Sequence, residues 1–226
     1  MAKIIKEREK TASPEVIEGF RELLKVYSPS CVIADAQERN GVMRSYMKPI
    51  DRSMRIAGSA LTVKLEPGDL VDCLDALTVA QEGDVIVVDA AGDTETSMWG
   101  GLMAGLCQMK GVVGAVVDGG IRDTDEMRDL GFAIFAKSVV PRGTHTMLTG
   151  RKDPIGINVP ISCAGMIVNP GDIIIGDEVG VVVVPLERAE EILEKSRKQA
   201  ALEEATRVEI RKGKTVDELL DEFGRL

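Results

Sequence analysis

Three charged side chains close together in the chain, Arg122, Asp123 and Glu126, have the types and spacing to bind a small acid and a metal ion. The planar guanidinium of an arginine can hold a carboxylate at two points. Carboxylates are hard oxygen ligands of the kind that Mg²⁺ or Mn²⁺ accepts together with several waters. Asp123 and Glu126 are three residues apart and share one face if the turn is helical. The alternative is a solvated ion pair of Arg122 with Asp118 or Glu126, which is common on protein surfaces.

A pair of glycines, Gly100 and Gly101, opens a second candidate segment that continues with Leu102 and Met103. Glycines at a helix start expose backbone N–H groups, and these groups, with the helix dipole, favour a carboxylate or an oxyanion. The segment lacks the glycine patterns of nucleotide-binding loops, which argues against a nucleotide ligand. A plain strand-to-helix turn would have the same local sequence and is the alternative interpretation.

Other polar residues lie near these segments in the sequence without forming a motif. The single histidine, His145, lies in a loop with glycine and proline, which leaves open a catalytic role beside a surface or lid role. Asp89, Asp93 and Glu95 precede the glycine pair, where an acidic loop near a metal and ordinary turn chemistry explain them equally. Asp125 is expected to face solvent.

The hydrophobic pattern predicts alternating strands and helices that would bring the two candidate segments together. A helix over 102–110 should end at Gly111, and a strand over 112–118 should follow and end before Gly119-Gly120. Loops are expected over 90–97 and 139–150. The other expected helices cover 14–27, 31–40, 70–80, 124–130, 186–202 and 206–226, the last with a break at Gly213. The other expected strands cover 47–51, 56–65, 85–89, 132–137, 156–162, 166–168, 173–176 and 181–185.

Composition is typical of an α/β or β-rich globular protein. Of the 226 residues, 44% are hydrophobic and only 3% are aromatic, which suits a core of stacked aliphatic strands. The formal net charge is −9 and no basic stripe is visible, so direct nucleic-acid binding is not expected. The apolar runs are too short to span a bilayer, and the charged start lacks the apolar core of a signal peptide. The four cysteines form no CxxC pair and are expected to be free, buried thiols in a reducing cytoplasm.

The two candidate segments also fit one longer motif. Gly101, twenty residues, Arg122-Asp123, two residues and Glu126 give the pattern G-x20-R-D-x2-E/D. Over about residues 30–200 the chain resembles the class II pyruvate aldolases of the 4-hydroxy-4-methyl-2-oxoglutarate/4-carboxy-4-hydroxy-2-oxoadipate aldolase family, which shares its fold with the regulator of ribonuclease E activity A. The matching text includes Asp35-Ala36, AGSALTV at 57–63, GDVIVVD at 83–89 and VNPGDIIIGDEVGVVVVP at 168–185.

The resemblance implies a fold and a site. The fold would be α/β, with a β/β/α swivelling-domain core over residues 1–200 and a helical C-terminal extension over 201–226, assembled as a homotrimer or homohexamer. The substrate would be bound by the backbone of Gly100, Gly101, Leu102 and Met103 and by Arg122. Asp123 would ligate a divalent Mg²⁺ or Mn²⁺, and Glu126 would hold metal-bound water. Arg122 and Asp123 would be the catalytic residues. Many aldolases of the family have an acidic residue after the first loop glycine, where this chain has Gly101.

The resemblance also implies a reaction. The expected activity is metal-dependent retro-aldol cleavage of a 4-hydroxy-2-oxo acid to pyruvate, with oxaloacetate decarboxylation as a side activity. The partner would be a small 2-oxo acid, with neither a nucleic acid nor a membrane involved, and a metal-adjacent water would be the base. The alternatives are a non-catalytic regulatory binding protein of the ribonuclease E regulator type, or an enzyme for sugar acids or hydroxy acids on the same scaffold.

Overall fold

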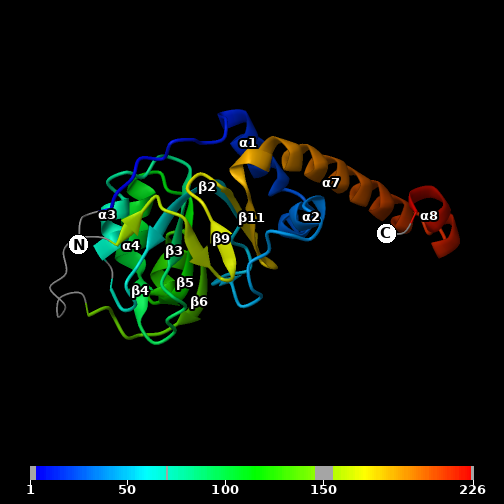
Figure 1. The fold of residues 1–226 in the computed structure, drawn as a ribbon. Coiled ribbons are helices and arrows are strands. Elements are labelled where there is room, and N and C mark those ends of the chain that lie inside the picture. Colours follow the sequence, from blue (N-terminus) through cyan, green and yellow to red (C-terminus); the bar gives the residue numbers. More distant parts are fainter. Residues whose placement is uncertain (1–3, 70, 146–154, 225–226) are drawn as a thin grey trace.

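The computed structural model describes residues 4–69, 71–145 and 155–224, and it has a central sheet with helices outside it (Figure 1). The described strands are β1 (Lys48–Pro49), β2 (Ile56–Lys64), β3 (Asp84–Asp89), β4 (Ser97–Trp99), β5 (Gly114–Ile121), β6 (Ala133–Val139), β7 (Gly156–Ile157), β8 (Ile161–Cys163), β9 (Met166–Val168), β10 (Ile173–Asp177) and β11 (Gly180–Val184). The described helices are α1 (Pro14–Leu23), α2 (Pro29–Ala36), α3 (Val71–Ala76), α4 (Gly101–Met109), α5 (Thr124–Asp129), α7 (Ala189–Arg211) and α8 (Val216–Phe223), with a 3₁₀ turn at Leu186–Arg188.

The sheet has a parallel centre and antiparallel edges. Its order is β1-β6-β5-β3-β2-β10-β11, with β4 paired to β5 and β7 paired to β2. Strands β2, β3, β5 and β6 are parallel, whereas β1, β10 and β11 run antiparallel to their neighbours. Because β1 also contacts β10 and β11, the two edges meet and the sheet nearly closes. The helices between the parallel strands make the crossover units that the alternating sequence pattern predicts, and the α/β fold class is confirmed.

Both faces of the sheet are buried, which explains the continuous apolar runs of its central strands. One face forms a core with α3, α4 and α5 that includes the fully buried Ile86 and Val117. The residue that follows Ile86, Val87, points to the opposite face of the sheet, because side chains alternate along a strand. Val87 belongs to a second core, which lies beneath the separate β8–β9 hairpin. A third core, around Phe20, joins α1, α2 and α7 to β2, β10 and β11.

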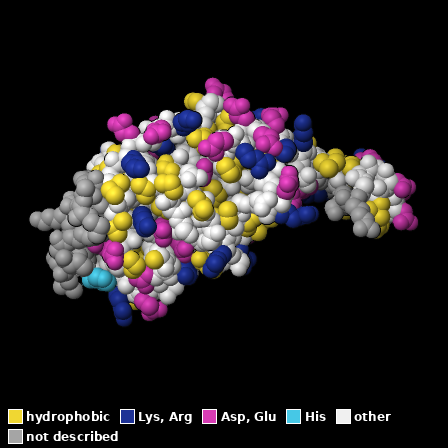
Figure 2. All heavy atoms as spheres, viewed as in Figure 1, with side chains coloured by type: hydrophobic (Ala, Val, Ile, Leu, Met, Phe, Trp, Pro, Cys, Tyr) yellow, Lys and Arg dark blue, Asp and Glu magenta, His cyan; other side chains and the backbone are white. Residues whose placement is uncertain are grey.

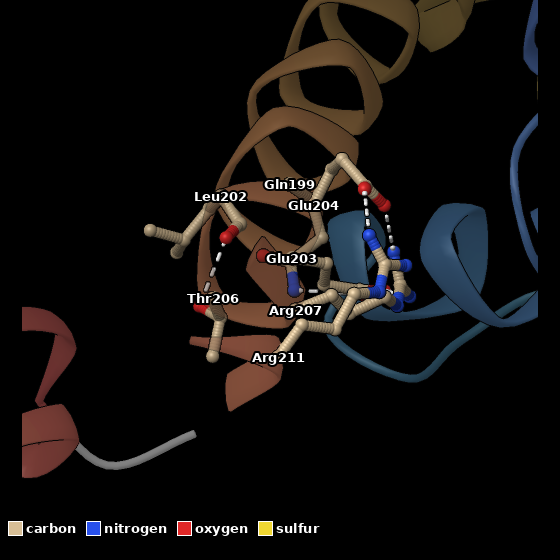
Figure 3. A network of polar contacts seen from close by, with 7 residues as sticks. All are labelled: Gln199, Leu202, Glu203, Glu204, Thr206, Arg207 and Arg211. Atoms are coloured by element: carbon tan, nitrogen blue, oxygen red, sulfur yellow. Dashed lines mark hydrogen bonds and ion pairs between the residues drawn. The ribbon is translucent and has the colours of Figure 1, made fainter. Parts of the chain in front are cut away.

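The C-terminal extension is a long helix that leaves the body of the protein (Figure 1). The first half of α7 is buried against the body around Ile192, whereas its second half carries charged side chains along the helix (Figure 3). There Arg207 lies between Glu203 and Glu204 at the i,i+4 and i,i+3 spacings, which adds a few tenths of a kcal/mol per pair to helix stability. The predicted interruption between residues 202 and 206 is absent, because α7 runs continuously from Ala189 to Arg211. The break expected at Gly213 is confirmed, since it separates α7 from α8.

Strand β5 is longer than the sequence predicts. It continues through Gly119 and Gly120, although the predicted strand ends at Asp118, and the predicted loop over 90–97 already enters β4 at its last residue. A Cβ on Gly119 would lie 2.5 Å from Cε of Met98, and one on Gly120 would lie 2.6 Å from the carbonyl oxygen of Thr96. These two glycines therefore permit the close approach of β4 to β5 instead of ending the strand.

One cysteine departs from its expected environment. Cys73, Cys107 and Cys163 are buried as predicted, whereas Cys31 is exposed. The prediction is wrong there because α2 buries Val32 and Ile33 against the body. Cys31 therefore lies on the solvent side of the helix.

The visible surface carries charges of both signs. Figure 2 shows basic and acidic side chains interspersed on one face, with no continuous basic stripe there. Among the described helices, none combines the length and the apolar character needed to cross a membrane. The α7 helix is the longest of them and is mostly polar.

A buried ion pair joins the N-terminal segment to the start of β3. Nη1 of Arg8 lies 2.7 Å from Oδ1 of Asp84, and both side chains are 3% exposed. Burial raises the pKa of the Asp84 carboxyl, although its hydrogen bond with Arg8 lowers it in part. The guanidinium therefore compensates a carboxylate that has little access to water.

We expect Arg8→Met to lower the free energy of unfolding by about 3–5 kcal/mol, because it leaves the Asp84 carboxylate buried without its partner. Adding Asp84→Asn should recover most of this loss, since the amide carries no charge. Urea unfolding followed by the fluorescence of Trp99 measures both variants. Equal stability of Arg8→Met and the unchanged protein would show that the pair contributes nothing to the fold.

Candidate active site

A short stretch of parallel pairing brings the two candidate segments side by side. Trp99 of β4 is paired with Ile121 of β5, and the amide of Arg122 donates to the carbonyl oxygen of Trp99 at 2.9 Å. Gly100 follows the first strand and Arg122 follows the second, so both lie at the carboxyl ends of neighbouring parallel strands. Small ligands commonly bind at this edge of an open α/β sheet. The predicted juxtaposition is therefore observed.

The N-terminus of α4 points its free amides into this place. Gly100 is the N-cap, and the first intrahelical bond runs from the amide of Ala104 to the carbonyl oxygen of Gly100 (3.1 Å). The amide of Gly101 donates to Oδ2 of Asp123 at 3.3 Å. The helix start is therefore already used as a site for one carboxylate oxygen, in keeping with its dipole.

The next two residues of α4 can contribute backbone groups but differ in their side chains. The side chain of Leu102 is 81% exposed, whereas that of Met103 is 4% exposed and belongs to the core. Their amides precede the first intrahelical bond and so have no partner within the helix. Amides of this kind at a helix start are groups to which an anion can bind.

Two carboxylates converge on the glycine pair. Asp123 lies in the left-handed region (φ 55°) at the start of α5, and Glu126 is in the first turn of that helix. A Cβ on Gly100 would lie 2.5 Å from Oδ2 of Asp123, and a Cβ on Gly101 would overlap the carboxylate of Glu126. The glycines thus leave the space that the two acids occupy.

Arg122 pairs with its neighbour in the chain. Its Nε lies 3.5 Å from Oδ2 of Asp123, and the two side chains are 48% and 43% exposed. Neither Asp118 nor Glu126, the partners considered from the sequence, forms an ion pair with Arg122 within the described residues. Half-exposed charged groups in this arrangement can reorient towards a ligand, because an exposed pair of this kind is weak.

Asp118 has a structural role near the end of β5. It is buried and accepts hydrogen bonds from the amide of Ala164 (2.7 Å) and the hydroxyl of Tyr46 (3.1 Å). The ammonium of Lys137 lies 5.0 Å from the centre of the Tyr46 ring and donates to the carbonyl oxygen of Gly92. These contacts join β5 to the β8–β9 hairpin and, through Tyr46 and Lys137, to the segment before β4.

The loop after β6 forms a further wall that the sequence did not predict. A Cβ on Gly143 would lie 2.5 Å from Nη1 of Arg122, so the loop passes directly over the guanidinium. The amide of His145 donates to the carbonyl oxygen of Gly68 at 3.0 Å. The available signals for this wall in the sequence were Gly143 and Gly68. A glycine in a loop, however, does not indicate which residue packs against it. The predicted loop beyond His145, from 146 to 150, lies outside the described residues.

The acidic residues before the glycine pair have turn functions. Oδ1 of Asp89 accepts from the amide of Ala91 at 3.0 Å, and Oδ1 of Asp93 accepts from the amide of Glu95 at 2.8 Å. Such contacts of an aspartate with the amide two residues later are typical of turns. Asp125 is exposed, as expected.

The donor set at the site suits a hard cation better than zinc. Asp123 and Glu126 supply two carboxylates, and Mg²⁺ is commonly held by one or two carboxylates with waters. A zinc site would need histidine or cysteine ligands. Among the described residues, no group of three or more His, Cys, Asp or Glu side chains could hold a metal. The metal assignment therefore stays a prediction, with Asp123 and Glu126 as the residues that fit it.

Comparison with known proteins identifies the family of this α/β chain. A family model described as RraA-like, Aldolase/RraA, matches residues 30–183. The chain therefore belongs to the Aldolase/RraA family, and the resemblance found in the sequence is confirmed.

Relatives within this family have two kinds of name. A Halalkalibacterium halodurans protein with the provisional name 4-hydroxy-4-methyl-2-oxoglutarate aldolase is 40% identical over 178 residues, covering 78% of this chain and 82% of its own. The 4-hydroxy-4-methyl-2-oxoglutarate aldolase of Thermus thermophilus is 29% identical over 154 residues, covering 68% and 90%. The Streptomyces coelicolor protein RraAS2, described as an unusual member of the RNase ES inhibitor RraA protein family, superposes with a TM-score of 0.74 at 28% identity, covering 88% and 99%.

The Tyr46 hydroxyl reports directly on the network around Asp118. Burial and then the negative charge of Asp118 raise the pKa of Tyr46 from 10.0 to about 12. We expect the ultraviolet absorbance of phenolate to show a component titrating near this pH, which Tyr46→Phe removes and Asp118→Asn shifts downward. Because the folded-state pKa is raised, the associated stability is present below about pH 10 and is lost as the pH rises towards 12. Titration of Tyr46 at its ordinary pH would contradict the hydrogen bond to Asp118.

Proposed function

We propose that the protein is a lyase that cleaves a 4-hydroxy-2-oxo acid by a retro-aldol reaction and releases pyruvate. The observation that carries the proposal is the convergence of Arg122, Asp123 and Glu126 on the free amides at the N-terminus of α4. The aldolase names of the Halalkalibacterium and Thermus relatives support the same class of reaction.

The pyruvyl end of the substrate binds between the helix start and the guanidinium. The amides of Leu102 and Met103 donate to the substrate carboxylate, and the helix dipole favours its negative charge. Arg122 donates to the oxygen at C2. Contacts from these two sides orient the substrate while its bond breaks.

Cleavage removes the proton of the C4 hydroxyl and shifts the electron pair of the C3–C4 bond before pyruvate forms. A water held by the Glu126 carboxylate accepts the proton of the C4 hydroxyl, and the C3–C4 bond breaks as C4 becomes a carbonyl. The electron pair of that bond moves into the pyruvyl part, which becomes an enolate with charge on the C2 oxygen. Arg122 stabilises this charge. Return of the proton from that water to C3 then gives pyruvate.

Asp123 would hold a divalent Mg²⁺ or Mn²⁺ in this site, with Glu126 contacting it through water. When bound, the cation would supply a Lewis acid for the C2 oxygen. The same enolate forms when oxaloacetate loses carbon dioxide, so we propose oxaloacetate decarboxylation as a side activity.

The exposed face of α4 supports assembly of the chain with copies of itself. Leu102, Leu106 and Met109 are 81%, 41% and 84% exposed and recur at a helical spacing. Apolar residues clustered on one exposed face commonly mark an interface. A homotrimer or homohexamer, as the resemblance implies, would cover this face beside the candidate site.

Asp123→Asn should lower the rate of pyruvate formation from 4-hydroxy-4-methyl-2-oxoglutarate by about 100-fold or more, because it removes the proposed metal ligand beside the reacting oxygen. EDTA should abolish the activity of the unchanged protein, and Mg²⁺ or Mn²⁺ should restore it. A coupled lactate dehydrogenase assay measures pyruvate.

The matched control is Asp125→Asn, which removes a carboxylate from an exposed position two residues away. It should retain the full activity. Full activity of Asp123→Asn, or activity indifferent to EDTA, would contradict the metal assignment. The absence of pyruvate release from any 4-hydroxy-2-oxo acid would contradict the proposed reaction itself.

Gly101→Ala should lower the activity about 10-fold while leaving the fold intact, because the new methyl group displaces the flexible end of Glu126. Gly105→Ala is the control on the same helix, since a Cβ there meets no atom within 4 Å. It should retain activity and gain about 0.5–1 kcal/mol of stability from its helix propensity. Activity assays with urea unfolding compare the two, and equal activities would show that the position of Glu126 is unimportant.

The second candidate function is a non-catalytic regulatory binding protein. It is favoured by the structural likeness to RraAS2, a protein described within a family of RNase ES inhibitors. The two functions differ in one simple outcome. A regulatory protein would form a stable complex with a ribonuclease and would release no pyruvate, with or without Mg²⁺.

A further inference from the structure

The loop after β6 carries the histidine of this chain to the rim of the candidate site. Backbone hydrogen bonds join the loop to both strands that end there. Gly143 then lies against the guanidinium of Arg122, and His145 follows two residues later. The backbone contacts are Val140 to Ile121 (2.9 Å) and Ser97 to Arg142 (2.8 Å).

Two glycines lie directly against the side chains of Arg122 and His145. A Cβ on Gly143 would lie 2.5 Å from Nη1 of Arg122. A Cβ on Gly68 would overlap the imidazole of His145, and the amide of His145 donates to the carbonyl oxygen of Gly68 at 3.0 Å. Since two residues of chain span at most about 7 Å, the imidazole-bearing backbone lies close to the guanidinium.

The groups of the site follow one another in space from α4 to this loop. The amide of Gly101 contacts Oδ2 of Asp123 at 3.3 Å, and the same oxygen lies 3.5 Å from Nε of Arg122. Nη1, another nitrogen of the guanidinium, faces Gly143. A substrate whose pyruvyl end lies at the helix start therefore extends past Arg122 towards the loop with His145.

We infer that His145 is a specificity-determining residue that binds a second carboxylate, at the far end of the substrate from the pyruvyl group. The inference rests on the proposed function and assigns a role to His145 in binding those 4-hydroxy-2-oxo acids that carry a distal carboxylate. The imidazole is exposed, and its ring N–H is a hydrogen-bond donor that a carboxylate accepts well. It takes no part in bond cleavage, so its effect falls on substrates that carry the second carboxylate.

The test compares two substrates that differ at the distal end. The first is 4-hydroxy-4-methyl-2-oxoglutarate, which has the distal carboxylate, and the second is 4-hydroxy-2-oxopentanoate, which lacks it. His145→Ala should raise the KM for the first by roughly 10- to 100-fold with little change in kcat, as expected for the loss of a charged hydrogen bond. The constants for the second substrate should stay the same. His145→Gln, which keeps an N–H donor, should retain part of the preference.

Arg142→Gln is the matched control, because it removes an exposed cation from the same loop. It should leave the preference unchanged, and equal unfolding midpoints should show that all variants are folded. An equal loss on both substrates, no loss on either, or the same effect from Arg142→Gln would overturn the role of His145 while the lyase function stands. Failure of the unchanged protein to cleave either substrate would overturn the proposed function, and this inference with it.

Discussion

The pairing of β4 with the end of β5 is the contact on which the candidate site depends. It consists of a short parallel register and the hydrogen bond from the amide of Arg122 to the carbonyl oxygen of Trp99 (2.9 Å). This contact sets the N-terminus of α4 beside the charged turn, although the two are some twenty residues apart in the chain. Gly119 and Gly120 permit it, because a side chain at either would strike β4 or the residue before it. Met98, Trp99 and Ile121 of these two strands are buried in one hydrophobic core, which keeps the strands packed against the body of the protein.

The chemistry of the site follows from how its charges are balanced. Asp123 and Glu126 lie near each other against the same glycine pair, which is unfavourable for two carboxylates. The start of α4 offsets part of this charge through the amide of Gly101, and Arg122 offsets a further part. A divalent cation would complete the balance and leave the guanidinium free for a substrate oxygen. The exposure of these side chains, close to half for Arg122 and Asp123, suits groups that must meet an incoming ligand.

The sequence predicted most of the fold and the grouping of the site residues, but not the contacts that position them. The alternation of apolar runs and turns was enough for the crossover units, since each central strand is buried on both faces. The strand β4 was missed because three residues after a polar loop give no periodic signal. Strand β5 was predicted to end before Gly119-Gly120, because a glycine needed for close approach cannot be told from a glycine that ends a strand unless its packing partner is known. The same limit hid the role of Gly143 against Arg122, since a loop residue's distant neighbour is set by tertiary structure.

The most direct test of a 2-oxo-acid enolate site uses pyruvate alone, so that the identity of the cleaved substrate does not matter. Pyruvate is kept in D₂O with the protein and Mg²⁺, and the proton signal of its methyl group is followed by nuclear magnetic resonance. If Arg122 and the start of α4 stabilise the enolate, the methyl protons exchange and the signal decays faster than in buffer with Mg²⁺. Arg122→Gln should then exchange at the rate of the buffer. A methyl signal that decays no faster with the unchanged protein than in buffer would contradict the central claim.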